Sequence, residues 1–218
     1  MATKLTSFAS RVTPHVLGCP DPAVEEAIRD SCIEFCERSL YIQDTLDPVD
    51  TVAGQIDYDL EPPSDTLVAK IMRAWYKDVR LGAFSTDVLT SPDIYSPTYA
   101  GFSGESGEPA TLFQKDEATF TVLPAPSLSE TAVLTVRVAL KPTRTCSYVN
   151  DTLYNTWADT VACGARARLM AMPNQSWSNI QLSLHYRTLF EQGVNRARRI
   201  AEHGMVRSPM AVESRPFV

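Results

Sequence analysis

The chain has 218 residues, of which 44% are hydrophobic and 21% charged, and its formal net charge is −6. This length is enough to bury the core of one compact domain, or of a domain that carries an inserted module. The sequence contains no run of the roughly 18–20 apolar residues that span a bilayer, and residues 1–10 lack the apolar stretch of a signal peptide. No contact with a membrane is therefore expected.

The acidic residues are concentrated in the first two thirds of the chain. Residues 1–150 hold 12 Lys and Arg against 21 Asp and Glu, whereas residues 151–218 hold 8 against 5. A surface that binds nucleic acid needs clustered lysine and arginine. The acidic bulk therefore argues against such a surface over most of the chain.

Residues that commonly carry chemistry form no recognisable motif. The five cysteines include no CxxC pair, so neither a disulfide framework nor a zinc site is predicted, and we expect buried, small apolar side chains. They are Cys19, Cys32, Cys36, Cys146 and Cys163. His185 and His203 are separated by about 27 Å along a helix, too far to share a metal ion, and with His15 they are expected at the surface. The sequence predicts no cofactor and no enzymatic activity.

A first helix is predicted to begin at Asp21, where aspartate suits the N-cap and Pro22 suits the first turn. Apolar or small residues recur after it at helical spacing. They are Val24, Ala27, Ile28, Ser31, Cys32, Phe35, Ser39 and Ile42. Acidic residues, Glu34 among them, lie on the opposite side. The helix is expected to have one buried face and one exposed, acidic face.

The pattern then changes to a period of two residues. Ile56, Tyr58 and Leu60 alternate with two aspartates up to Pro62, which is typical of a half-buried strand. Residues 67–81 predict a second strand, with a bend or turn near its end. Helix therefore gives way to sheet in this part of the chain.

Residues 83–108 are rich in Ser, Thr, Pro and Gly, and they predict a long loop with one short helix at residues 86–89. A β-hairpin follows, with strands at residues 112–114 and 119–123 joined by a polar turn. Residues 131–140 alternate in polarity and predict a further strand. We expect these last three strands to form one small antiparallel sheet.

A helix capped by Asn150 or Asp151 is predicted to run until Pro173. Arg168 projects from its apolar side, and because an unpaired buried guanidinium is costly, we expect a partner within the fold rather than on a neighbouring subunit. Gly164 lies in the middle of this helix, where glycine costs about 1 kcal/mol relative to alanine. It indicates either the close approach of another helix or simple tolerance.

The last helix is predicted from the capping-box pattern at residues 178–181 to Gly204. Its apolar face is expected to include Leu182, Leu189 and Gly193, the last a second candidate for a close helix contact. Four arginines are expected to form a basic patch on this helix. They are Arg187, Arg196, Arg198 and Arg199. Such a patch suits bidentate pairing with carboxylates of an acidic protein surface, and DNA contact is the alternative.

Residues 205–218 show no periodicity. They combine two prolines with apolar and basic residues that suit docking into a groove of a partner. The candidate docking residues are Met205, Arg207, Met210, Val212, Arg215 and Phe217. Such a segment is either disordered or an arm that a partner orders.

Several stretches, taken in order, resemble one family. The sequences GEPATLF at 107–113, FTVLPAP at 120–126 and LTVRVALKP at 134–142 are similar to the β-module of the head-to-tail adaptor proteins of tailed bacteriophages, the tail tubular protein A-like group. The sequence ACGARARLMAMP at 162–173 is similar to their closing helices. The resemblance extends over residues 21–204.

The predicted elements and the resemblance together imply an α+β fold. In this organisation a helical bundle, made of residues 1–50 and the helical pair 150–204, carries an inserted β-module at residues 51–149. Residues 205–218 form an extended C-terminal arm.

The resemblance also implies a structural virion protein, made in the host cytoplasm and placed at the head-to-tail interface. Twelve copies would form a ring that contacts the portal protein through the C-terminal arm and the tail nozzle or tubular protein, and tail fibres, on the other side. DNA would pass through the lumen. Two other functions remain open: a tail-completion protein, and a DNA-binding packaging accessory that uses the arginines of the last helix.

Overall fold

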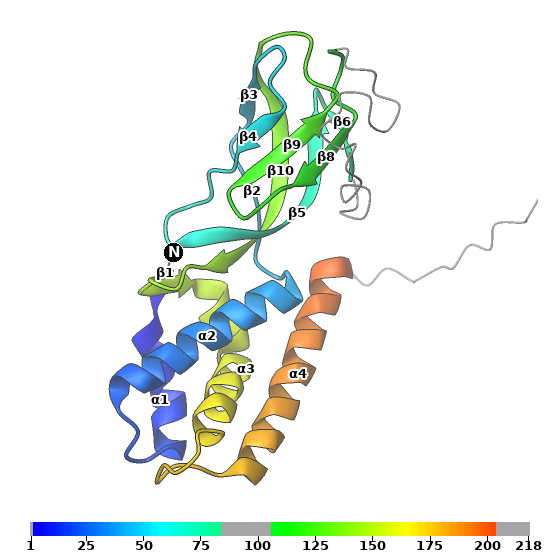
Figure 1. Ribbon diagram of the computed structural model, residues 1–218. Helices are drawn as coiled ribbons and strands as arrows, with labels where there is room; N and C mark the ends of the chain where they lie inside the picture. Colours follow the sequence, from blue (N-terminus) through cyan, green and yellow to red (C-terminus); the bar gives the residue numbers. More distant parts are fainter. Residues whose placement is uncertain (1, 84–105, 204–218) are drawn as a thin grey trace, which may run out of the picture.

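The computed structural model describes residues 2–83 and 106–203, and the chain is α+β (Figure 1). Long helices gather at one end of an elongated molecule and most strands at the other. Each end has its own cluster of buried apolar side chains. We refer to residues 2–39 and 146–203 as the helical unit, and to the described residues between 43 and 142 as the β-module.

The helical unit is built from both ends of the chain. Its N-terminal part comprises β1 (Ala2–Lys4), η1 (Leu5–Phe8), α1 (Ala9–Val12), η2 (Thr13–His15) and α2 (Asp21–Ser39). Its C-terminal part comprises β11 (Tyr148–Asn150), α3 (Asp151–Met170) and α4 (Ile180–His203). Strand β1 pairs with β11, and α2, α3 and α4 pack against one another. The two parts of the chain are therefore joined both by a sheet and by a shared core.

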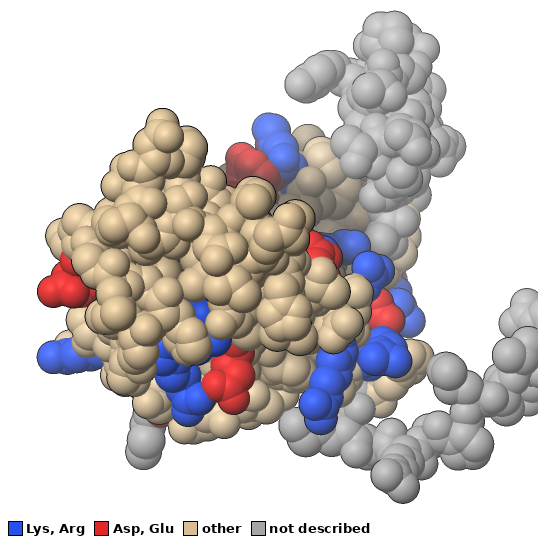
Figure 2. Space-filling model, turned by 90° about the horizontal axis from the view of Figure 1, so that it is seen from below, with Lys and Arg blue, Asp and Glu red and all other residues tan. Residues whose placement is uncertain are grey.

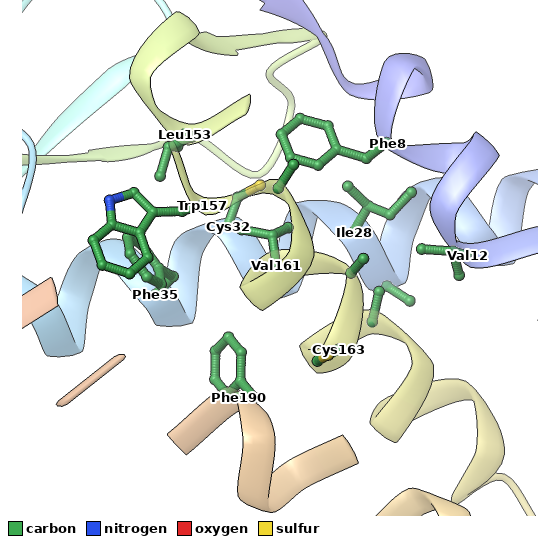
Figure 3. Packing of buried hydrophobic residues seen from close by; sticks show 14 of the residues in the cluster. Phe8, Val12, Ile28, Cys32, Phe35, Leu153, Trp157, Val161, Cys163 and Phe190 are labelled. Carbon is green, nitrogen blue, oxygen red and sulfur yellow. The ribbon is translucent and has the colours of Figure 1, made fainter. Parts of the chain in front are cut away.

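Apolar side chains from all three long helices form the core of the helical unit (Figure 3). Phe35 on α2 and Phe190 on α4 are fully buried, and the rings of Phe35 and Trp157 have centroids 5.4 Å apart. Burying one large apolar side chain contributes about 1.5–3 kcal/mol. This core therefore supplies much of the stability of the unit.

Residues 5–16 also enter this core, a feature not predicted from the sequence. Leu5, Phe8, Val12 and Val16 are buried, and the short helices η1 and α1, which carry the first three, pack against α2 and α3. These residues recur three or four positions apart, so successive turns present them to the same side.

Two glycines allow α3 and α4 to lie close together. A Cβ atom at Gly164 would lie 2.8 Å from Cδ2 of Phe190, and one at Gly193 would lie 2.3 Å from Cγ2 of Thr160. Both separations are far inside the optimal distance between carbon atoms. Close helix approach, one of the two interpretations of these glycines, is therefore confirmed.

The ends of α2 differ from the prediction. The helix begins after Pro20, which occupies the N-cap position, and the side chain of Asp21 lies in the first turn. It ends at Ser39 because Leu40 adopts a left-handed conformation with φ of 51°. Ile42 therefore lies beyond the helix, in the connection to the β-module.

The caps of α3 and α4 follow the rule that polar side chains accept the free amides of the first turn. The side chain of Asn150 accepts a hydrogen bond from the amide of Thr152 at 2.9 Å, as predicted. At α4 the side chain of Asn179, rather than Ser178, accepts a hydrogen bond from the amide of Leu182 at 3.1 Å.

The β-module contains two sheets. One has the order β2 (Gln43–Thr45), β10 (Glu130–Pro142), β5 (Thr66–Tyr76) and β6 (Val79–Arg80), and β3 (Val49–Thr51) also pairs with β10. The other has the order β4 (Asp57–Asp59), β9 (Thr119–Leu123), β8 (Thr111–Gln114) and β7 (Gly82–Ala83). Their inner faces share one core, which includes Phe120 of β9 and Leu134 of β10. Among these strands only β7 and β8 pair in parallel.

This arrangement corrects the expected single sheet. The hairpin of β8 and β9 is confirmed, and in its turn Asp116 accepts hydrogen bonds from the amides of Ala118 and Thr119. The predicted further strand, β10, lies in the other sheet, where it pairs with β5 from Leu134 to Pro142. The module also begins at residue 43 rather than 51, because β2 and β3 pair with β10. The short helix expected at residues 86–89 lies outside the described residues.

The two units meet where α2 ends and β10 leaves the module. Ile42 packs against both cores. Lys141 of β10 donates hydrogen bonds to Glu37 of α2 at 2.7 Å and to Glu117 of the β8–β9 turn at 2.5 Å. The side chain of Lys141 is only 12% exposed, so water competes little for these contacts. The contact with Glu37 ties the β-module to the helical unit.

Candidate interaction surfaces

A network of ion pairs around Glu34 joins α2 to α3 and α4. The carboxylate of Glu34 accepts hydrogen bonds from Arg168 at 2.6 Å, from Arg187 at 2.7 Å and from Arg38 at 2.9 Å. Glu191 of α4 pairs with Arg38 and with Arg187. Burial raises the pKa of Glu34, but the hydrogen bonds from the arginines outweigh it and hold that pKa below its ordinary value. Arg168 thus has a partner within the fold, as predicted.

The four arginines expected to form one basic patch on α4 are divided between two sides of the helix. Arg187 belongs to the ion-pair network, and Arg198 pairs with Glu202 at 2.9 Å. Arg196 and Arg199 are exposed and form no ion pair within the part of the chain that the structure describes. At 100° per residue, Arg196 projects nearly opposite to Arg198. Of the four, Arg196 and Arg199 are therefore the two arginines without an ion-pair partner among the described residues.

The three histidines are exposed, as predicted. Nδ1 of His15 lies 3.3 Å from the hydroxyl of Tyr186, and the two rings meet edge to face. Burial and the nearby Arg166 lower the pKa of His15. This contact links the short N-terminal helices to α4.

Four of the five cysteines are buried, and Cys19 is partly exposed. Burial raises the pKa values of Cys32, Cys36 and Cys146, so these thiols remain protonated near neutral pH. Within residues 2–83 and 106–203, no group of three or more His, Cys, Asp or Glu side chains is placed to bind a metal ion. In the same residues no helix is long and apolar enough to cross a membrane.

The end of the helical unit that lies farthest from the β-module has a broad area without charged side chains (Figure 2). Residues 12–20 and 169–186 contain no Asp, Glu, Lys or Arg, and they meet there, with Ser176 beside Gly18. Large apolar side chains are exposed on these two segments. They are Leu17, Met172, Ile180, Leu182 and Leu184. We call this surface the neutral end, and exposed apolar areas of this kind commonly mark protein contacts.

Two leucines of α4 lie outside its buried face, contrary to the prediction. Leu182, which was expected on the buried face, is 43% exposed. Leu189 is likewise exposed, whereas Gly193 faces the core as predicted. The buried face of α4 is therefore narrower than the sequence indicated.

A cavity of about 340 Å³ opens at the junction of the two units. Its apolar lining is formed by Cys36, Ile42, Leu140, Val149 and Leu153. Polar residues complete it, among them Asp44, Ser64, Asp65, Thr66 and Lys141. We call it the junction pocket, and its volume falls within the usual range for binding pockets.

The residues expected in the docking arm lie outside the described residues. They are Met205, Arg207, Met210, Val212, Arg215 and Phe217. No protein-family model matches the sequence, and no curated protein matches it.

Proposed function

We propose that the chain is a structural virion protein, a head-to-tail adaptor whose copies form a ring between the portal and the tail. The observation that carries the proposal is the order of the units along the chain. Both ends of the chain build the unit of three long helices, and the β-module is inserted between α2 and α3. The resemblance to the adaptor family implies the same order, a helical bundle with a β-insertion.

The surfaces of the molecule support this proposal. A ring built by rotation needs different faces toward its two neighbours, and further faces toward the proteins above and below it. The neutral end and the side of α4 that bears Arg196 and Arg199 differ in chemistry, and they lie at opposite ends of this helix, because the neutral end includes its first residues. In the ring, residues 205–218 contact the portal, the tail nozzle or tubular protein binds the opposite side, and DNA occupies the lumen.

Mixing the protein with purified portal and imaging the product by electron microscopy tests this function. We expect a ring of copies on one face of the portal. A chain that lacks residues 205–218 should keep its melting temperature and fail to attach. If the full chain stays separate from the portal at micromolar concentrations, the adaptor function is wrong, and binding to tails instead would identify a tail-completion protein.

The exposed Arg196 and Arg199 keep a DNA-binding packaging accessory as the second candidate. Such a protein should bind duplex DNA at low salt and lose affinity steeply as salt rises, because binding releases counterions. The variant Arg196→Glu/Arg199→Glu should then lose binding, whereas Arg198→Glu, on the other side of α4, should lose less. Absence of duplex binding at low salt would remove this candidate.

A further inference from the structure

The junction pocket has two features that an occupant must match. Its buried lining is apolar, whereas Asp44 and Asp65 at its edge are exposed and form no ion pair with any described residue. The one cation among its lining residues, Lys141, is already paired with Glu37 and Glu117. The pocket therefore presents uncompensated negative charge beside apolar surface.

The end of this same chain has the complementary composition. Residues 204–218 contain Arg207 and Arg215 against a single acidic residue, Glu213. They also contain several large apolar residues, Phe217 among them. A peptide of this kind matches the pocket in both charge and hydrophobicity.

The segment follows directly after α4. The described chain ends at His203, in the last turn of α4, at the level where the helical unit meets the β-module (Figure 1). Fifteen residues span up to about 50 Å when extended, which exceeds the length of about 36 Å of α4 itself. Residues 204–218 can therefore reach any part of the junction on their own subunit.

We propose that residues 204–218 dock in the junction pocket of their own subunit, with the arginines facing Asp44 and Asp65 and apolar side chains against the lining. Tethering gives the segment an effective concentration in the millimolar range, so a weak contact is enough for occupancy. The docking itself does not depend on the adaptor function. The biological role of the docking does rest on the adaptor function: the pocket would hold residues 204–218 until the portal displaces them.

Fluorescence anisotropy of a labelled peptide of residues 204–218 tests the docking. The partner is the chain shortened to residues 1–203, which keeps its fold because both cores consist of earlier residues. We expect saturable binding with Kd below about 1 mM. The full chain should bind the peptide more weakly, because its own segment competes, and a scrambled peptide of the same composition should bind more weakly to the shortened chain.

Two double variants locate the binding surface. Asp44→Asn/Asp65→Asn removes both charges without added bulk, and asparagine tolerates the φ of 61° at residue 65. We expect binding weaker by about three- to thirtyfold, as for the loss of two exposed ion pairs. The control Asp47→Asn/Asp59→Asn makes the same charge change elsewhere on the β-module and should leave binding unchanged.

Three results would each overturn the docking. They are no saturable binding at about 1 mM, equal binding by the full and shortened chains, and equal losses in the two double variants. None of these measurements involves the portal. Failure of the docking is therefore distinguishable from failure of the adaptor function.

Discussion

The helical unit closes around residues from both ends of the chain, whereas the β-module folds from the stretch between them. The core of the helical unit joins residues 5–36 to residues 146–197, and the core of the module lies within residues 46–140. Bringing distant segments together carries a loop-closure cost, which the folded module reduces by holding its own ends near each other. The β-module therefore separates the two parts of the helical unit along the chain and, once folded, brings them close together in space.

The largest effects should come from emptying either core. Phe190→Ala in the helical unit and Phe120→Ala in the module each remove a fully buried ring, and each should cost about 3–5 kcal/mol of unfolding free energy. Hydrogen exchange measured by mass spectrometry should show most of the loss of protection in the unit that carries the substitution. Equal loss of protection in both units would show that they unfold together, which contradicts the distinction between the two units.

A smaller effect should follow from Gly193→Ala. Alanine favours the helix by about 1 kcal/mol, but its Cβ would meet Thr160 at 2.3 Å, and overpacking costs about 1–3 kcal/mol. We expect a net loss of about 1 kcal/mol in urea unfolding. Asn195→Ala, at an exposed position of the same helix, is the control and should be neutral or slightly stabilising. A stable Gly193→Ala variant would contradict the close approach of α3 and α4.

The smallest effect is on the pH dependence of stability, and it too should differ between the helical unit and the β-module. Hydrogen bonds from arginines hold the pKa values of Glu34 and Glu191 below their ordinary range. A carboxylate with a lowered folded-state pKa contributes stability that is complete above its unfolded-state pKa of about 4.3 and is lost as pH falls through the folded value. Thermal melts from neutral pH to about pH 3 should therefore show a steeper loss for the native chain than for Glu34→Gln.

The β-module provides the control for this pH effect. Glu130 also has a lowered pKa, through hydrogen bonds from Lys77 and Tyr76, but solvent screens it and Glu130→Gln should change the pH profile less. Parallel profiles for the native chain and Glu34→Gln would show that the network around Glu34 adds nothing to stability.

Features with local signals were predictable from the sequence. The Asn150 cap, the polar turn between β8 and β9, and the alternation in β10 each depend on residues a few positions apart. The membership of β10 in a different sheet from β9 was not predictable, because it depends on pairing with the distant β5. The short helices that carry Leu5 and Val12 were not predicted, although their apolar residues recur at helical spacing.

The candidate surfaces also differ in how far the sequence alone predicts them. Helical geometry alone would have separated Arg196 from Arg198, and the neutral end is visible as two charge-free runs, residues 12–20 and 169–186. The fold alone shows that these runs meet. The junction pocket is lined by several separate segments, so no local pattern marks it.

In the ring that we propose, the neutral end has a consequence for the response to ionic strength. A joint made through Leu17 and Ile180 has no charge pair for dissolved ions to screen, and excluded salts such as sulfate strengthen apolar association. A joint made through Arg196 and Arg199 weakens as the Debye length shortens. Concentrated salt should therefore dissociate contacts made through Arg196 and Arg199 first. Contacts made through the neutral end should persist.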